Sequence, residues 1–143
     1  MRKPRRGLLA LAATAGVAAT LIAPSAAYAA YYGDETDYAV SSSGPVGTYY
    51  CTYTSYTGAR VCFQPYGDLV YVKDTNADGY AAVGEWIGDG FSRTGSCVNK
   101  LGNGNWGVCN KDFPENQGLY ITGARYSSGN PVDSGGSTWV PTS

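Results

Sequence analysis

The chain has 143 residues, a formal net charge of −1, 13 tyrosines, four cysteines and no histidine. This length predicts about one domain. Because histidine is absent, Ser-His-Asp and Cys-His catalytic mechanisms are excluded.

The first 29 residues have the three parts of a secretory signal peptide. Met1–Arg6 is basic, Gly7–Ile22 is an apolar run, and Ala27-Tyr28-Ala29 is a small-residue cleavage site. A retained membrane anchor is the alternative, but the apolar run is shorter than a bilayer span. We therefore expect removal of residues 1–29, a mature chain that starts at Ala30, and secretion into the extracellular space.

Loss of the signal peptide makes the chain more acidic. The mature part has 143 − 29 = 114 residues, with 11 acidic residues and 10 − 4 = 6 basic ones, a formal charge of −5. Nucleic acid and anionic membranes are not expected as partners, because their phosphates repel such a chain.

Residues 30–47 differ in composition from the rest of the mature chain. The segment "AYYGDETDY" is rich in tyrosine and acid, and "AVSSSGPVG" is typical of a linker. We expect an extended arm outside a β domain of residues 48–143, although a disordered tail is the alternative. Aromatic residues flanked by acids suit docking into a groove with a basic rim. The predicted partner-binding residues are Tyr31, Tyr32, Asp34, Glu35, Asp37 and Tyr38.

No helical periodicity follows, and short runs rich in Tyr, Val, Thr, Ile and Trp alternate with turn residues. In one run, Leu119 and Ile121 oppose Tyr120 and Thr122, as in a strand with one buried face. The sequence therefore predicts an all-β fold, a small antiparallel β-sandwich or barrel. The expected strands are 48–55, 59–64, 69–73, 80–87, 91–97, 106–111, 119–126 and 137–140.

Four cysteines in an exported chain predict two disulfides, with three possible connectivities. Turn residues lie midway between Cys51 and Cys62 and between Cys97 and Cys109, so each pair resembles the two legs of one hairpin. We expect these two pairings. A zinc site is disfavoured because the chain has no histidine and no C-x2-C pair.

Residues 74–85, "DTNADGYAAVGE", match the calcium-loop pattern of an EF-hand at every constrained position. An EF-hand loop is flanked by helices, whereas these flanks are strand-like. The core "DTNADG" also suits a hairpin loop. Calcium stays an alternative, and the expectation is a hairpin loop with no metal and no cofactor.

An enzyme that uses two carboxylates, such as a glycoside hydrolase, is a further alternative. Most of the candidate acids adjoin turn residues, where solvated acids are common, so no catalytic residue is predicted. These acids are Asp68, Asp74, Asp78, Glu85, Asp89, Asp112 and Glu115.

Tyrosine is unusually abundant, with 12 in the mature chain. The rings suit packing on half-buried strand faces, which is the simpler explanation. They also suit a recognition surface for carbohydrate or protein. Tyr49 and Tyr50 are consecutive, so in a strand they point to opposite faces.

The block "VCFQPYGDLVYVKDTNADGYAAVGEW" and the "RTGSC" to "GVC" segment resemble small secreted β proteins of actinomycetes. Within that group the chain is similar to the adaptor subunits of umbrella toxin particles, which join a lectin-bearing subunit to a toxin-bearing stalk protein. The resemblance implies a non-enzymatic connector in an antibacterial secreted complex. A carbohydrate-binding module and a hydrolase inhibitor are the alternatives.

Overall fold

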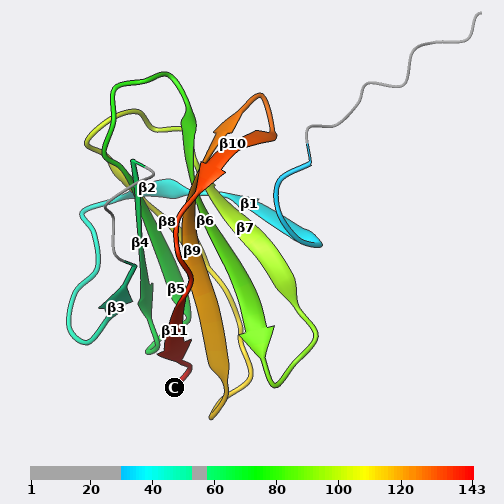
Figure 1. Cartoon of the computed structure of the whole chain (residues 1–143). Helices are drawn as coiled ribbons and strands as arrows, with labels where there is room; N and C mark the ends of the chain where they lie inside the picture. Colours follow the sequence, from blue (N-terminus) through cyan, green and yellow to red (C-terminus); the bar gives the residue numbers. More distant parts are fainter. Residues whose placement is uncertain (1–29, 53–57) are drawn as a thin grey trace, which may run out of the picture.

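The computed structural model describes residues 30–52 and 58–143, which form eleven strands and no helix (Figure 1). The predicted signal peptide, residues 1–29, lies outside these ranges. Within the described ranges, no helix is long and apolar enough to cross a membrane.

The strands form two stacked sheets, which confirms the expected β-sandwich. Sheet A has the order β1-β7-β6-β9-β10, with β11 also paired to β9. Its strands are β1 (Glu35–Tyr38), β6 (Ala81–Asp89), β7 (Thr94–Asn99), β9 (Gly118–Ser127), β10 (Asn130–Ser134) and β11 (Thr138–Pro141). Sheet B has the order β2-β8-β5-β4-β3. Its strands are β2 (Val40–Ser42), β3 (Tyr50–Cys51), β4 (Ala59–Gln64), β5 (Leu69–Asp74) and β8 (Trp106–Asn110).

The main core lies between the sheets, where alternate strand residues point inward. Trp86 from sheet A is fully buried and contacts Phe113, with ring centroids 4.9 Å apart. At Gly84 a Cβ atom would lie 2.8 Å from Val72, so glycine allows the sheets to approach closely. The buried cluster includes Phe63, Val70, Val72, Trp86, Phe113, Leu119, Ile121 and Val140.

A second apolar cluster lies on the outer face of sheet A. Val83, Val98 and Ala124 supply its floor, and Tyr31 and Tyr126 cover it. The ring centroids of Tyr31 and Tyr126 are 5.1 Å apart. Tyr31, close to the start of the described residues, is therefore part of the folded structure.

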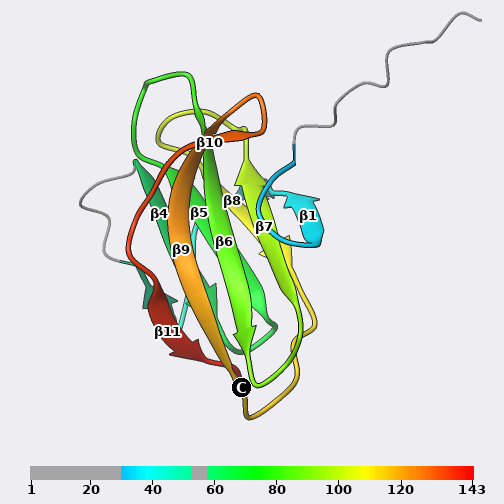
Figure 2. The same ribbon diagram turned by 45° about the vertical axis from the view of Figure 1, so that its right-hand side comes forward.

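The expectation that residues 30–47 form an arm outside the sandwich is wrong. The segment is extended, but β1 pairs with β7 in parallel and β2 pairs with β8 antiparallel, so the chain crosses from sheet A to sheet B (Figures 1 and 2). At the crossing, the amide of Ala39 donates a hydrogen bond to the carbonyl of Val98. The sequence does not indicate this pairing, because β1 and β2 are short and the strands that they pair with lie far along the chain.

Both predicted disulfide pairings, Cys51–Cys62 and Cys97–Cys109, are confirmed. Cys51 and Cys62 stand opposite each other in the antiparallel pair of β3 and β4, as a hairpin requires. The expected hairpin across Cys97 and Cys109 is wrong, because β7 belongs to sheet A and β8 to sheet B. The second disulfide therefore joins the two sheets.

Candidate functional site

The six predicted partner-binding residues divide into buried and accessible ones. Tyr31 is only 7% exposed, whereas Tyr38 is 59% exposed with the Lys100 ammonium 4.9 Å from its ring centroid. Asp34 is exposed, and Tyr32 is partly buried. The structure thus brings Tyr31 into the fold, and a role of the remaining residues in partner binding stays a prediction.

Glu35 and Asp37, the other two predicted residues, form ion pairs with the body of the sandwich. Glu35 accepts hydrogen bonds from Arg93 at 2.7 Å and from Lys111 at 2.8 Å. Lys111 also pairs with Asp37. The hydrogen bonds from Arg93, together with Lys111, lower the pKa of Glu35 to about 2. These contacts fasten β1 to the rest of the molecule.

The calcium-like segment connects two sheets, so the expected hairpin at this place is wrong. It leads from β5 in sheet B to β6 in sheet A. Asp74 accepts a hydrogen bond from the amide of Asn76, and Asp78 accepts one from the amide of Tyr80 and pairs with Arg125. Glu85 hydrogen bonds instead to Tyr126 on the outer face of sheet A. In the part of the chain that the structure describes, no three His, Cys, Asp or Glu side chains converge as a metal site.

Asp68 is another candidate acid in a buried environment. Its Oδ2 accepts a hydrogen bond from the amide of Phe113, while Oδ1 is buried without a partner among the described residues. Burial raises its pKa. Asp68 is only 9% exposed, so little of the residue is open to a substrate.

A row of exposed apolar side chains crosses the outer face of sheet A. Ile87 stands opposite Tyr120, and Tyr120 stands opposite Trp139, so the three residues share one face of β6, β9 and β11. They are 40%, 41% and 48% exposed, respectively. We call these three residues the outer-face row. Figure 2 shows β6 and β9 side by side, with β11 along β9.

Trp139 is held in place although it is half exposed. Its Nε1–H donates a hydrogen bond of 2.8 Å to Oδ2 of Asp89. A Cβ atom at Gly118 would overlap the indole, so the ring lies against a position without a side chain. A fixed, accessible indole loses little conformational freedom when it binds.

Glu85 lies beside the outer-face row. It is partly buried, and its Oε1 accepts a hydrogen bond of 2.6 Å from the hydroxyl of Tyr126. Burial raises the pKa of Glu85, and the hydrogen bond from Tyr126 opposes that shift. Burial also raises the pKa of Tyr126, with Glu85 as the next cause.

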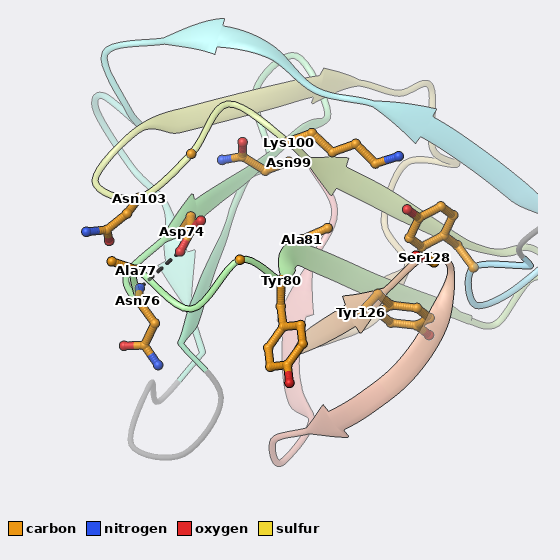
Figure 3. Close-up of a pocket in the computed structure, with 13 residues that line it drawn as sticks. Asp74, Asn76, Ala77, Tyr80, Ala81, Asn99, Lys100, Asn103, Tyr126 and Ser128 are labelled. Carbon is orange, nitrogen blue, oxygen red and sulfur yellow. Dashed lines mark hydrogen bonds between the residues drawn. The ribbon is translucent and has the colours of Figure 1, made fainter.

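A polar pocket of about 390 Å³ lies at one end of the sandwich, between the β5–β6 and β7–β8 connections and the β9–β10 turn. Figure 3 shows Asp74, Asn76, Lys100 and Asn103 around it, with Tyr80 and Tyr126 on its other side. Asn99 donates to the carbonyls of Val72 and Asn105, which stiffens the pocket wall. Amide, carboxylate and aromatic groups of this kind can bind carbohydrate hydroxyls and ring faces.

A second exposed apolar surface lies at the β3 edge of sheet B. It includes Tyr66, which is 87% exposed, together with Val46, Tyr49 and Tyr50. β3 pairs with β4 and ends the strand order on that side of sheet B. A hollow of about 490 Å³ lies between Val46 and Tyr66. We call Val46, Tyr49, Tyr50 and Tyr66 the β3-edge patch.

Comparisons with protein-family models, with curated proteins and with solved structures found no match to this chain. A function is therefore inferred from the chemistry of its surfaces.

The outer-face row was missed at the sequence level, although one signal for part of it was present. The alternation in β9 placed Tyr120 and Thr122 opposite the buried pair Leu119 and Ile121. That pattern predicts an outward Tyr120. Its neighbours Ile87 and Trp139 depend on strand register, which the pattern of one strand does not give.

Proposed function

We propose that the chain is a secreted, non-enzymatic adaptor that binds another secreted protein through the outer-face row. The observation that carries the proposal is the indole of Trp139, which is fixed by Asp89 and Gly118 and yet is 48% exposed. Tryptophan and tyrosine dominate the binding energy of many protein interfaces. Their apolar area is removed from water on binding, at little cost in side-chain entropy.

The secreted location is part of the proposal. The predicted signal peptide supports it, and two disulfides in a small β protein are consistent with an extracellular place. The resemblance to umbrella-toxin adaptors suggests a lectin or toxin-bearing subunit as the partner, in a complex used for antibacterial competition.

An adaptor needs a second contact surface, and the β3-edge patch supplies one. Its aromatic side chains adjoin the last strand of sheet B. A strand at a sheet edge offers main-chain donors and acceptors to an added strand. The two surfaces lie on different sheets, so two partners could be held at once.

The test begins with the tagged full-length protein, which captures its partner from the culture supernatant of a producing organism. The partner is then identified, purified and titrated against variants. Trp139→Ala should weaken binding about thirtyfold, the effect of losing about 2 kcal/mol at a binding hot spot. Gly118→Ala should weaken it too, because the new methyl group displaces the indole.

Tyr80→Ala is the matched control. Tyr80 is an exposed aromatic residue that lines the end pocket, away from the outer-face row. It should bind the partner as the unchanged protein does, and all three variants should melt cooperatively. Wild-type affinity in Trp139→Ala and Gly118→Ala would reject the outer-face row as the binding surface.

A carbohydrate-binding module is the second candidate, and the polar end pocket is the observation that favours it. Retention on a polysaccharide column that is lost in Tyr80→Ala and kept in Trp139→Ala would support this function over the adaptor. The inhibitor alternative depends on the loop between Cys51 and Cys62, of which residues 53–57 lie outside the described ranges.

A further inference from the structure

Four carboxylates form ion pairs within the molecule, whereas Glu85 forms none among the described residues. Glu35 and Asp37 pair with Arg93 and Lys111, and Asp78 and Asp133 pair with Arg125. Across residues 30–52 and 58–143, no Lys or Arg nitrogen forms a salt bridge with Glu85. Its one hydrogen bond comes from the hydroxyl of Tyr126 and engages Oε1. Oε2 has no donor within those ranges.

The groups that face Glu85 carry no positive charge. Tyr126, Tyr120 and Thr122 come from β9, and Tyr32 comes from the N-terminal segment. Ser134 is the last residue of β10, and Ser137 lies in the β10–β11 connection. Ser96 of β7, the register partner of Glu85, donates its hydroxyl hydrogen to the carbonyl of Tyr32. Neutral groups thus surround a carboxylate that has partly lost its water.

A hollow of about 200 Å³ opens beside this carboxylate. It is lined by Tyr32, Glu85, Ile87, Tyr120, Thr122, Ser134, Gly135 and Ser137. We call it the Glu85 slot. Several water molecules would fill such a volume, and so would the end of one long side chain. Aromatic rings beside a carboxylate suit a cation, because ring faces attract positive charge.

We propose that the Glu85 slot receives a lysine or arginine side chain of the partner protein, an inference that rests on the proposed adaptor function. The slot and the outer-face row share Ile87 and Tyr120, so one partner covers both. The cation supplies the positive partner that the Glu85 carboxylate lacks. The apolar stem of the lysine or arginine side chain lies against Tyr32 and Tyr120. The acidic mature chain adds a favourable field for a basic partner surface.

This assignment explains why the carboxylate is placed there. A buried charge without a partner costs folding stability, and a cation of a second protein removes that cost in the complex. The row then supplies apolar contact, and the slot selects a partner with a basic residue at one position. Specificity of this kind arises because a partner without the cation leaves the carboxylate unpaired.

The experiment uses the full mature protein and a defined probe, Nα-acetyl-lysine N-methylamide, in an NMR titration. Saturable shifts at Glu85, Tyr120 and Thr122 are expected, with a dissociation constant in the millimolar range typical of a single small contact. Glu85→Gln should weaken binding at least tenfold, while it keeps an oxygen that accepts the Tyr126 hydrogen bond. The arginine analogue should bind at the same residues.

Two controls make the result specific. Glu115→Gln carries the same change at an exposed acid outside the slot and should bind the probe normally. The Nε-acetylated lysine probe has no charge and should not bind. Equal binding by Glu85→Gln, equal binding of the acetylated probe, or saturation of the slot by N-acetylglucosamine instead would overturn the proposal.

The outcome for the proposed function is separate. Once the partner is purified, Trp139→Ala tests the outer-face row, and Glu85→Gln tests the slot. A partner that depends on Trp139 and binds Glu85→Gln at full affinity would reject the slot and leave the adaptor function intact. Independence from Trp139 would reject the adaptor surface itself, whatever the lysine probe does.

Discussion

Two glutamates in the same sheet have opposite electrostatic surroundings. Glu35 accepts hydrogen bonds from Arg93 and Lys111, which favour its charged form. Glu85 is partly buried, and among the described residues the Tyr126 hydroxyl is its one donor, so burial favours its neutral form. The two residues therefore affect the stability of the protein in opposite directions as the pH changes.

Glu35→Gln should destabilise the protein at neutral pH. The pKa of Glu35 falls from 4.5 to about 2 on folding, so its contribution is present above pH 4.5 and is lost between about pH 4.5 and 2. Because about a third of the side chain is exposed, we expect a loss of about 1–2 kcal/mol at pH 7 after allowance for solvent screening. Urea unfolding of both proteins at pH 7 and pH 2 measures this. A difference that persists at pH 2 would contradict the ion-pair explanation.

Glu85→Gln should change the stability of the protein in the opposite direction. A raised pKa in the folded state means that the contribution of Glu85 is present below its unfolded pKa and is lost as the pH rises through the folded value. The glutamine variant, which stays neutral, should therefore be more stable than the unchanged protein at pH 7 and equally stable at pH 3.5. Urea midpoints at the two pH values test this, and greater stability of the unchanged protein at pH 7 would show that the carboxylate is stabilised.

At the scale of elements, the two disulfides have different structural roles. They close loops of nearly equal length, with separations of 11 and 12 residues. The loop-entropy model therefore gives them similar effects of about 3 kcal/mol. Cys97 and Cys109 are both buried and join the two sheets, whereas Cys51 is partly exposed on the short strand β3.

Paired alanine replacements should separate these roles. Replacing Cys51 and Cys62 should cost about 2–3 kcal/mol. Replacing Cys97 and Cys109 should cost about 1–2 kcal/mol more, because a cavity forms between the sheets. The free energy of unfolding in urea measures both losses. Equal losses would mean that loop closure alone accounts for the stability that each disulfide contributes.

The strands also show how far local sequence determines structure. β4 was predicted at its observed bounds, since Ala59–Gln64 is a run of strand-forming residues between turns. β1, β2 and β10 were missed. Tyr38 and Val40 are exposed, so no apolar alternation marks these short segments, and β10 contains Pro131 and a register shift. For β1 and β2 a distant strand fixes the conformation, and a single sequence carries little record of such pairing. β10 pairs with the adjacent strand β9, and its proline and irregular register obscure the strand pattern.

The candidate site depended on the same information. The sequence left two roles open for the tyrosines, packing and recognition. The structure assigns Tyr31 to packing and exposes Tyr120, and a recognition role stays a prediction. Trp139 gained significance only from its register with Tyr120 and from the empty position at Gly118. Residue types alone do not show which side chains of three strands lie next to one another.

At the scale of the whole molecule, the N-terminal segment closes the sandwich. Tyr31→Ala should cost about 2–4 kcal/mol, because it opens the outer-face cluster of Val83, Val98 and Ala124. Tyr38→Ala, at the last residue of β1, is the matched control and should change stability little, since its ring is largely exposed. Thermal melting compares the two, and equal melting temperatures would mean that the segment is not held as described.

Deletion of residues 31–46 should prevent stable folding. It removes β1 and β2, uncovers the outer-face cluster, and leaves the largely buried Lys111 without Glu35 and Asp37. A buried charge that loses its partners typically costs about 3–5 kcal/mol. Loss of the cooperative melt is the expected result. A soluble variant with unchanged melting would instead show that these strands are dispensable.

The pairing of β1 with β7 also limits how early the N-terminal segment can fold. The ribosome makes β1 before the other described strands, yet the amide of Asp34 bonds to Thr94, 60 residues later in the chain. Contacts this distant in sequence form slowly, because a long loop must first be closed. Tyr31 and its neighbours therefore stay exposed on the growing polypeptide until most of it has been synthesised. In that interval the segment is open to chaperones and to the β7 strand of another copy, so we expect exchanged dimers among the misfolded products at high concentration.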